Sequence, residues 1–175
     1  TIVMSSTYRQ PSNARPELQE RDPANQLLAR QGRFRLTAEL IRDSTLAVSG
    51  LLYPKVGGRS VRPPQPEGAK RMGASGDGGW KVSEGRDRYR RGLYVQYQRM
   101  APYPQLSNFD MPAGYEASSR RSRSNTPLQA LNLMNDVTYA EASRALAERT
   151  MSADSTVEQT VAVMYPMATA REPDP

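Results

Sequence analysis

Residues 120–131 read RRSRSNTPLQAL, and this stretch joins a basic segment to a strong helix-start signal. Thr126 is suited to cap a helix, Pro127 fits its first position, and Gln129 completes a Thr-x-x-Gln capping box. A helix that begins here directs unpaired backbone N–H groups toward the arginines before it, and such a start attracts an anion. We therefore predict a helix from Pro127, with an internal carboxylate or an anionic ligand beside its start.

Two further helices are predicted after this one. Asp136 can cap a helix over residues 137–150, which is rich in alanine and therefore strongly helix-favouring. Ser155 and Glu158 have the spacing of a second capping box, ahead of a last helix that Pro166 should interrupt.

The first convincing helix of the chain is predicted over residues 33–49. Gly50 follows it at the position of a left-handed stop. The apolar residues expected on one face of this helix are Leu36, Leu40, Ile41, Ala47 and Val48. Residues 1–12 look like the end of a helix, and Asp22 followed by Pro23 favours a helical turn.

Residues 54–80 form a long segment rich in glycine and proline, and we predict a loop with an extended stretch at 62–66. The pair Gly57-Gly58 is not followed by the Gly-Lys-Ser/Thr of a phosphate-binding loop, which argues against nucleotide binding. Trp80, the single tryptophan, is interpreted as an anchor of this loop in preference to a platform for a ligand.

Arginines alternate with tyrosines between residues 83 and 103. The spacing favours a short helix that ends before Pro102, although the alternation of Leu93, Val95 and Tyr97 also fits a strand. Interleaved arginine and tyrosine can bind a ligand through charge and stacking. The alternative is a packing layer of these side chains around Asp87.

Composition indicates a mainly α-helical protein. Hydrophobic residues make up 37% of the 175 residues and there are 14 prolines, so we expect an irregular helical domain with long Gly/Pro-rich loops. We interpret residues 1–175 as a single domain and as the C-terminal portion of a larger one. The net charge of +6 comes almost entirely from arginine. These arginines either pair with internal carboxylates or form a face for a polyanion.

The residue types exclude several chemistries. The sequence has no cysteine and no histidine, so it cannot form disulfides, a thiol nucleophile, imidazole metal ligands, a covalently attached haem or a Ser-His-Asp triad. No catalytic motif, metal site or cofactor site is predicted. No apolar run approaches the roughly 18 residues of a membrane span.

Ordered blocks along the chain resemble the planctomycete PSD family, a domain of unknown function. The blocks are STYRQ (6–10), DPAN (22–25), AELIRD (38–43), SGLL (49–52), GGRSV (57–61), QP (65–66), DRYRRGLY (87–94), PYP (102–104), FD (109–110) and residues 120–136. The resemblance implies a mainly helical bacterial protein outside the cytoplasm, in the periplasm or at the cell surface. It also implies a cytochrome-c-like domain elsewhere in a longer exported chain, and no established activity.

We expect an interaction or ligand-binding module, whose partners could be anionic glycans. Its arginines form two blocks, one at residues 88–91 and the other at residues 120–121. We expect the two blocks to meet near the start of the helix at Pro127. The candidate binding residues are Arg88, Arg90, Arg91, Tyr94, Tyr103, Arg120, Arg121, Asn125 and Thr126. One alternative is a scaffold that docks to the haem-bearing portion of a longer chain. Another is a carboxylate-based glycan-active enzyme using Asp87, Asp110 and Glu116. An exported location argues against nucleic acid as the partner.

Overall fold

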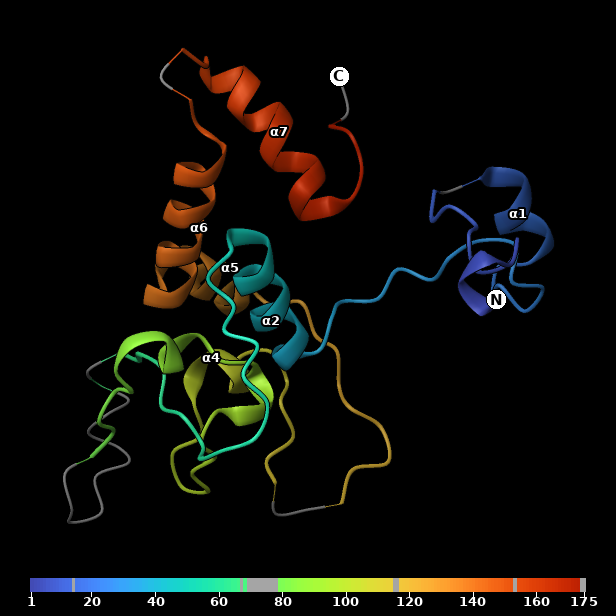
Figure 1. The fold of residues 1–175 in the computed structure, drawn as a ribbon. Coiled ribbons are helices and arrows are strands. Elements are labelled where there is room, and N and C mark those ends of the chain that lie inside the picture. Colours follow the sequence, from blue (N-terminus) through green and yellow to red (C-terminus); the bar gives the residue numbers. More distant parts are fainter. Residues whose placement is uncertain (14, 67, 69–78, 115–116, 153, 174–175) are drawn as a thin grey trace. The chain divides into compact units, whose positions relative to one another are not determined.

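The computed structural model describes residues 1–13, 15–66, 68, 79–114, 117–152 and 154–173. The chain divides into two compact units, Thr1–Arg35 and Leu36–Pro175. The described residues are mainly helical, as the sequence predicts, and they form no sheet (Figure 1). Most of the predicted 54–80 loop is described, but its residues 67 and 69–78 lie outside the described residues.

The first unit contains the 3-10 turn η1 (Ile2–Met4) and the short helix α1 (Pro16–Arg21). The predicted helix end at the N-terminus is thus a single turn, and α1 was not expected. Asp22 ends α1, and its carboxylate accepts the backbone N–H groups of Gln26 and Leu27 at 2.8 and 2.7 Å. These bonds lower the pKa of Asp22 and confirm that it caps the turn that follows.

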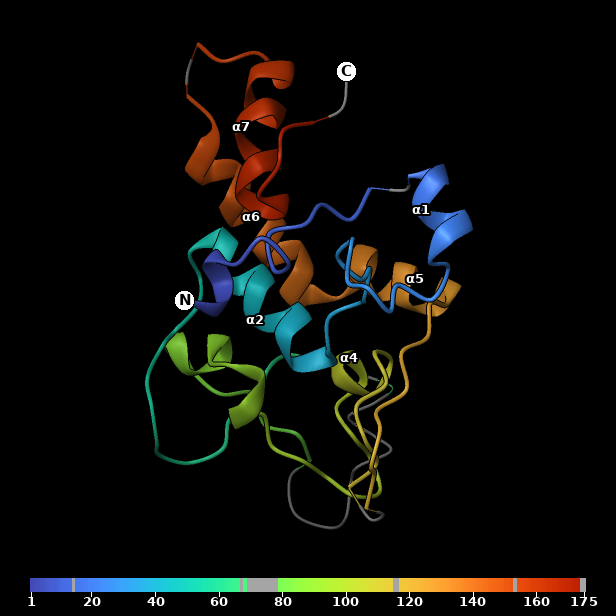
Figure 2. The same cartoon turned by 90° about the vertical axis from the view of Figure 1, so that its right-hand side faces the viewer.

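Helix α2 (Ala38–Ser49) is the central element of the second unit (Figures 1 and 2). It ends at Gly50, whose φ of 80° is the predicted left-handed stop. α2 packs against four other elements, η3 (Gly92–Tyr94), α4 (Pro104–Ser107), α6 (Val137–Thr150) and α7 (Val157–Thr169).

The buried face of α2 differs from the predicted one. Leu36 and Leu40 remain 49% and 46% exposed, whereas Arg42 and Leu46 are both 0% exposed. The helix is rotated in this way because the Arg42 Nη1 and Nη2 groups find their acceptors inside the unit, and a buried cation is costly unless it is hydrogen-bonded.

The core is built around an aromatic stack. Trp80 and Tyr103 lie parallel with ring centroids 5.6 Å apart, and the Trp80 Nε1–H donates to the Pro63 carbonyl at 2.6 Å. Trp80 therefore anchors the end of the Gly/Pro-rich segment, which confirms that interpretation. The core cluster comprises Ala38, Trp80, Tyr103, Leu106, Phe109 and Tyr139. Leu106 comes from helix α4 (Pro104–Ser107), a helix that was not predicted from the sequence.

The segment of alternating arginine and tyrosine forms neither of the predicted elements. It folds into two 3-10 turns, η2 (Gly85–Tyr89) and η3 (Gly92–Tyr94). Isolated parallel bridges join Tyr53 to Arg90 and Val61 to Val95. These long-range bridges extend the backbone after each turn, so a continuous helix cannot form.

Three helices complete the second unit: α5 (Pro127–Asn135), α6 (Val137–Thr150) and α7 (Val157–Thr169). The predicted starts of α5 and α6 are confirmed, including the complete Thr126–Gln129 capping box and the Asp136 cap.

The prediction for α7 was wrong in two respects. Its capping box is Thr156–Gln159, one residue later than the predicted Ser155–Glu158 pair. Ser155 instead uses its hydroxyl to bond the Ser152 carbonyl. Pro166 lies inside α7 without ending it.

Candidate functional site

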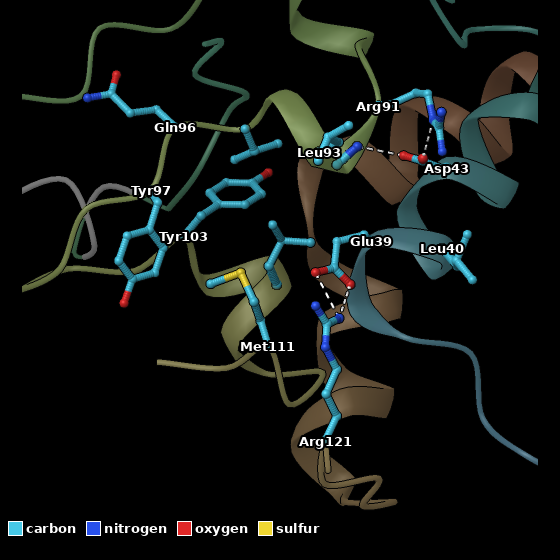
Figure 3. A pocket seen from close by; sticks show the side chains of 13 residues that line it. Glu39, Leu40, Asp43, Arg91, Leu93, Gln96, Tyr97, Tyr103, Met111 and Arg121 are labelled. Carbon is cyan, nitrogen blue, oxygen red and sulfur yellow. Dashed lines mark hydrogen bonds and ion pairs between the residues drawn. The ribbon is translucent and has the colours of Figure 1, made fainter. Parts of the chain in front are cut away.

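A pocket of about 420 Å³ opens in the second unit beside α2, η3 and α4 (Figure 3). Its apolar lining includes Val95, Leu106 and Met111, together with the buried ring of Tyr103. Tyr97, which is 41% exposed, borders it. Two arginine–carboxylate pairs line another part of the pocket, so its surface combines an apolar floor with a few placed polar groups.

Asp43 on α2 holds one of these arginines and the turn beside it. Its two carboxylate oxygens accept the Arg91 Nε–H at 2.9 Å and the Gly92 backbone N–H at 2.6 Å. The hydrogen bond and charge of Asp43 raise the pKa of Arg91. A Cβ on Gly92 would lie 3.0 Å from the Glu39 Cα, so glycine permits this close approach of η3 to α2.

Glu39, one turn before Asp43, holds the second arginine. The Arg121 Nη1 donates to both Glu39 carboxylate oxygens, at 3.0 and 2.8 Å (Figure 3). Burial raises the pKa of Glu39, but hydrogen bonds from its own backbone and from Arg121 outweigh burial and leave that pKa below its ordinary value. The side chains of Arg91 and Arg121 remain 52% and 43% exposed.

Both guanidiniums keep unused hydrogen-bond donors. Arg121 donates to Glu39 only through Nη1, and Arg91 donates to Asp43 only through Nε. An arginine carries five N–H groups, so each has donors left. Among the described residues these donors have no other hydrogen-bond partner. The carboxylates therefore fix the direction of the guanidiniums while leaving part of each accessible from the pocket.

Arg90 and Tyr94, two predicted binding residues, hold a loop. Arg90 is 1% exposed and donates to the carbonyls of Lys55, Gly57 and Arg59 at 2.9, 2.5 and 3.0 Å. Its guanidinium lies over the Tyr94 ring at 3.8 Å, and the Tyr94 hydroxyl accepts the Gly57 N–H at 2.8 Å. These contacts are internal, and the pocket lining includes neither residue.

Arg88 and Tyr103 also make internal contacts. Arg88 pairs with Glu141 of α6 at 2.5 Å. The Tyr103 hydroxyl donates to the Pro64 carbonyl at 2.9 Å, and burial raises the pKa of Tyr103 to about 12, although Arg42 opposes the rise. Tyr103 lines the pocket as part of its floor, whereas Arg88 does not line it.

The remaining predicted residues lie around the start of α5. Asn125 and Thr126 are exposed, as is Arg120, whose guanidinium has no hydrogen-bond or ion-pair partner among the described residues. Nearby, the Asp110 carboxylate accepts the Ser124 backbone N–H at 2.7 Å and the Ser124 hydroxyl at 2.9 Å. An internal carboxylate thus lies beside the helix start, one of the two options that the sequence left open.

The two arginine blocks meet on α2, not at the start of α5 as expected. Arg91 from one block and Arg121 from the other line the same pocket, because Glu39 and Asp43 present carboxylates on one face of α2. Sequence reasoning did not propose either carboxylate as a site residue. Their spacing of four residues on a predicted helix was the available signal.

The carboxylates suggested for catalysis are not gathered in this pocket. Asp110 is bonded to Ser124, Asp87 lines a separate groove, and Glu116 lies outside the described residues. Within the described part of the chain, no group of three or more acidic side chains could hold a metal ion. The described helices also include none with the length and apolar character needed to cross a membrane.

Fold and pocket together define a mainly helical protein with an arginine–carboxylate pocket. The model of the family PSD1, described as a protein of unknown function (DUF1553), matches residues 1–175, so the chain belongs to this family. Neither the curated proteins nor the solved structures include a significant match to the chain.

Proposed function

We propose that the chain is a ligand-binding module whose pocket holds a glycan that carries carboxylate or sulfate groups. The observation that carries this proposal is the pair of oriented, half-exposed arginines at the pocket, Arg91 and Arg121. A carboxylate or sulfate can accept two parallel N–H groups from one guanidinium, which gives strong and directional recognition.

The apolar part of the pocket suits the body of a sugar. Tyr97 exposes an aromatic ring on the same side of the pocket as Met111 (Figure 3), and Leu106 also lines the pocket. The C–H face of a sugar ring packs against such surfaces, while its hydroxyl groups can bond the exposed edges of the two ion pairs. A volume of about 420 Å³ lies within the range of small-molecule sites.

The local charge favours an acidic ligand only modestly. Glu39 and Asp43 neutralise the two arginines, so recognition depends on hydrogen-bond geometry more than on a strong positive field. Arg120, adjacent in sequence to Arg121, does not line the pocket. Binding should therefore weaken with salt, but less steeply than at an unpaired cluster of arginines.

Calorimetric titration with acidic and neutral oligosaccharides tests the proposal. We expect acidic oligosaccharides to bind, and the Arg121→Ala variant to lose at least roughly tenfold in affinity, since a charge-assisted hydrogen bond contributes about 1.5–3 kcal/mol. Arg144→Ala is the matched control, because Arg144 pairs with Glu148 on the exposed surface of α6. Equal binding by Arg121→Ala and Arg144→Ala would contradict the proposal.

The Glu39→Gln variant separates two ways of using the pocket. Removing the Glu39 charge frees the Arg121 Nη1 and leaves its cation uncompensated, so the affinity for acidic oligosaccharides should rise. If Glu39 were itself the acceptor for the hydroxyl groups of a neutral glycan, the same variant would weaken binding. A higher affinity of the variant for acidic ligands would therefore identify the anionic group as the recognised feature, whereas a lower affinity would assign recognition to the Glu39 carboxylate.

The proposed setting follows from the resemblance to the planctomycete PSD family. We propose an extracytoplasmic location, in the periplasm or at the cell surface of a planctomycete, and a cytochrome-c-like portion in the same longer chain. Detection of the native protein in periplasmic or surface fractions of such a bacterium would test the location. Recovery in the cytoplasmic fraction would contradict it.

A second candidate function is docking to that cytochrome-c-like portion, and helix α5 favours it. Its leucines face outward, with Leu128 and Leu131 56% and 55% exposed and Met134 78% exposed, while Gln129 is buried. An apolar helix face of this kind is a typical protein-binding surface. The two portions, produced as separate chains, should bind each other, and Leu128→Ser with Leu131→Ser should abolish binding. Unchanged binding by that variant would exclude α5 as the surface.

A further inference from the structure

We infer that the ligand is a chain of several sugar units that extends from the pocket into a second groove across Gln96. This inference rests on the proposed function and specifies its ligand. The second groove has a volume of about 670 Å³ and is lined by Arg59, Arg62, Lys81, Glu84 and Asp87. Gln96 lines both this groove and the pocket, so the two spaces adjoin there.

The boundary between the two spaces is held in a defined position. The Gln96 backbone N–H donates to the Val61 carbonyl at 2.8 Å, and its side-chain Oε1 accepts the Arg62 Nε–H at 2.5 Å. Figure 3 shows the side chains of Gln96 and Tyr97 leaving the backbone in different directions. In extended backbone, neighbouring residues point to opposite sides. This segment can therefore contact a ligand with Tyr97 in the pocket and with Gln96 toward the groove.

Apart from Arg62, the charged side chains of the groove make no hydrogen bond or ion pair with the described residues. Arg59 and Lys81 are exposed, and neither side chain has a hydrogen bond or ion pair to any described residue. The carboxylates of Glu84 and Asp87 likewise have no hydrogen bond or ion pair to any described residue. Charged groups that make no internal contacts but line one groove remain available for a ligand.

The mixture of charges in the groove indicates the kind of polymer. Arg59, Arg62 and Lys81 can bind acidic groups, whereas Glu84 and Asp87 can accept hydrogen bonds from hydroxyl groups. A uniformly and densely charged polyanion would be repelled by the two carboxylates. A polysaccharide that bears both hydroxyl and carboxylate groups, such as a uronic-acid polymer, satisfies both sets of side chains.

The test is a titration with size-graded oligogalacturonates, from dimer to octamer. Occupation of two adjoining spaces by one chain makes the second contact intramolecular, so affinity should increase roughly tenfold or more from dimer to octamer. The double variant Arg59→Ala with Lys81→Ala should lose this increase and still bind the dimer as the unmodified protein does. Both substitutions are at exposed positions, and an unchanged thermal transition will show that the variant is folded.

Each other result overturns a specific statement. If the unmodified protein binds dimer and octamer equally, the extended site does not exist, although the proposed function stands. If the increase persists in the double variant, it reflects the greater number of binding registers on a longer chain, and the groove is not the site. If no oligomer binds, oligogalacturonates are not ligands, and both this inference and the proposed use of the pocket fail for uronic-acid polymers.

Discussion

Arg42 places a cation in the interior of the second unit, where it is 0% exposed. Its Nη1 donates to the Gln105 Oε1 at 2.8 Å, and its Nη2 donates to the Arg88 carbonyl at 2.7 Å. Gln105 in turn donates to the Asp136 carboxylate at 3.2 Å. The Arg42 charge is thus balanced by Asp136 through a neutral amide, and three distant segments are joined at one residue.

We expect Arg42→Met to destabilise the protein by about 3–5 kcal/mol, because it leaves Asp136 buried without its cation. Urea denaturation monitored by Trp80 fluorescence measures this loss. Arg144→Met is the control, since it removes an exposed ion pair that contributes at most about 1 kcal/mol. Similar midpoints for the two variants would mean that the buried charge does not support the fold.

Tyr103 makes stability depend on pH at the alkaline end. Its pKa is about 12 in the folded protein, against an ordinary value of 10.0. The tyrosine therefore contributes stability that is fully present below pH 10 and is lost as the pH rises toward 12. Tyr103→Phe removes the hydrogen bond to Pro64, so the variant should be less stable at neutral pH by about 1 kcal/mol.

The difference between Tyr103→Phe and the unmodified protein should narrow as the pH rises above 10, because phenylalanine cannot ionise in the unfolded chain. Urea denaturation at neutral pH and at alkaline pH measures this difference in the free energy of unfolding. A constant difference across this range would show that Tyr103 does not govern the alkaline loss.

At the scale of elements, two helices begin with the same capping box in different surroundings. In α5 the box is Thr126–Gln129, and in α7 it is Thr156–Gln159. Gln129 is 4% exposed and also donates to the Asn108 carbonyl at 2.9 Å and to the Ser124 hydroxyl at 3.1 Å. The α5 box therefore connects a helix start to α4 and to the segment that carries Arg121.

Alanine at Gln129 should cost more stability than alanine at Gln159. Both substitutions remove the same capping contact, but Gln129→Ala also leaves the Asn108 carbonyl without its donor, a penalty of about 1–3 kcal/mol. Chemical denaturation of the two variants under identical conditions provides the comparison. Equal losses would indicate that the contacts beyond the box contribute nothing.

At the scale of the whole molecule, the two units are stabilised differently. The second unit contains the aromatic core, whereas among the described residues of the first unit only Asp22 is buried. Polar side chains hold the first unit by bonding its backbone, as Arg30 does with the Pro23 carbonyl at 2.7 Å and Asp22 with the Leu27 N–H at 2.7 Å.

Residues 36–175 should therefore fold without residues 1–35. Trp80 is the single tryptophan and is 5% exposed, so its fluorescence reports the core of the second unit. The shortened chain should show the same buried-tryptophan emission and a cooperative thermal transition. Solvent-exposed emission at room temperature would contradict this expectation.

The sequence by itself determined the features that depend on neighbouring residues. The starts of α5 and α6, the left-handed stop at Gly50 and the mainly helical class were predictable, because a cap satisfies backbone groups only a few residues away. One cap was misplaced by one residue, at α7, where Ser155 and Thr156 are both suitable capping residues.

Only the tertiary structure decided which side chains lie inside and which arginines serve the fold. Arg121 and Glu39 are 82 positions apart, and Arg42 and Gln105 are 63 apart. The spacing of residues within one helix cannot predict contacts between residues so far apart in the sequence. The energy of a buried arginine depends on whether a distant acceptor satisfies it, and this is settled when the segments pack. The candidate pocket therefore could not be predicted from the sequence, although both of its arginines belong to the two arginine blocks that the sequence analysis identified.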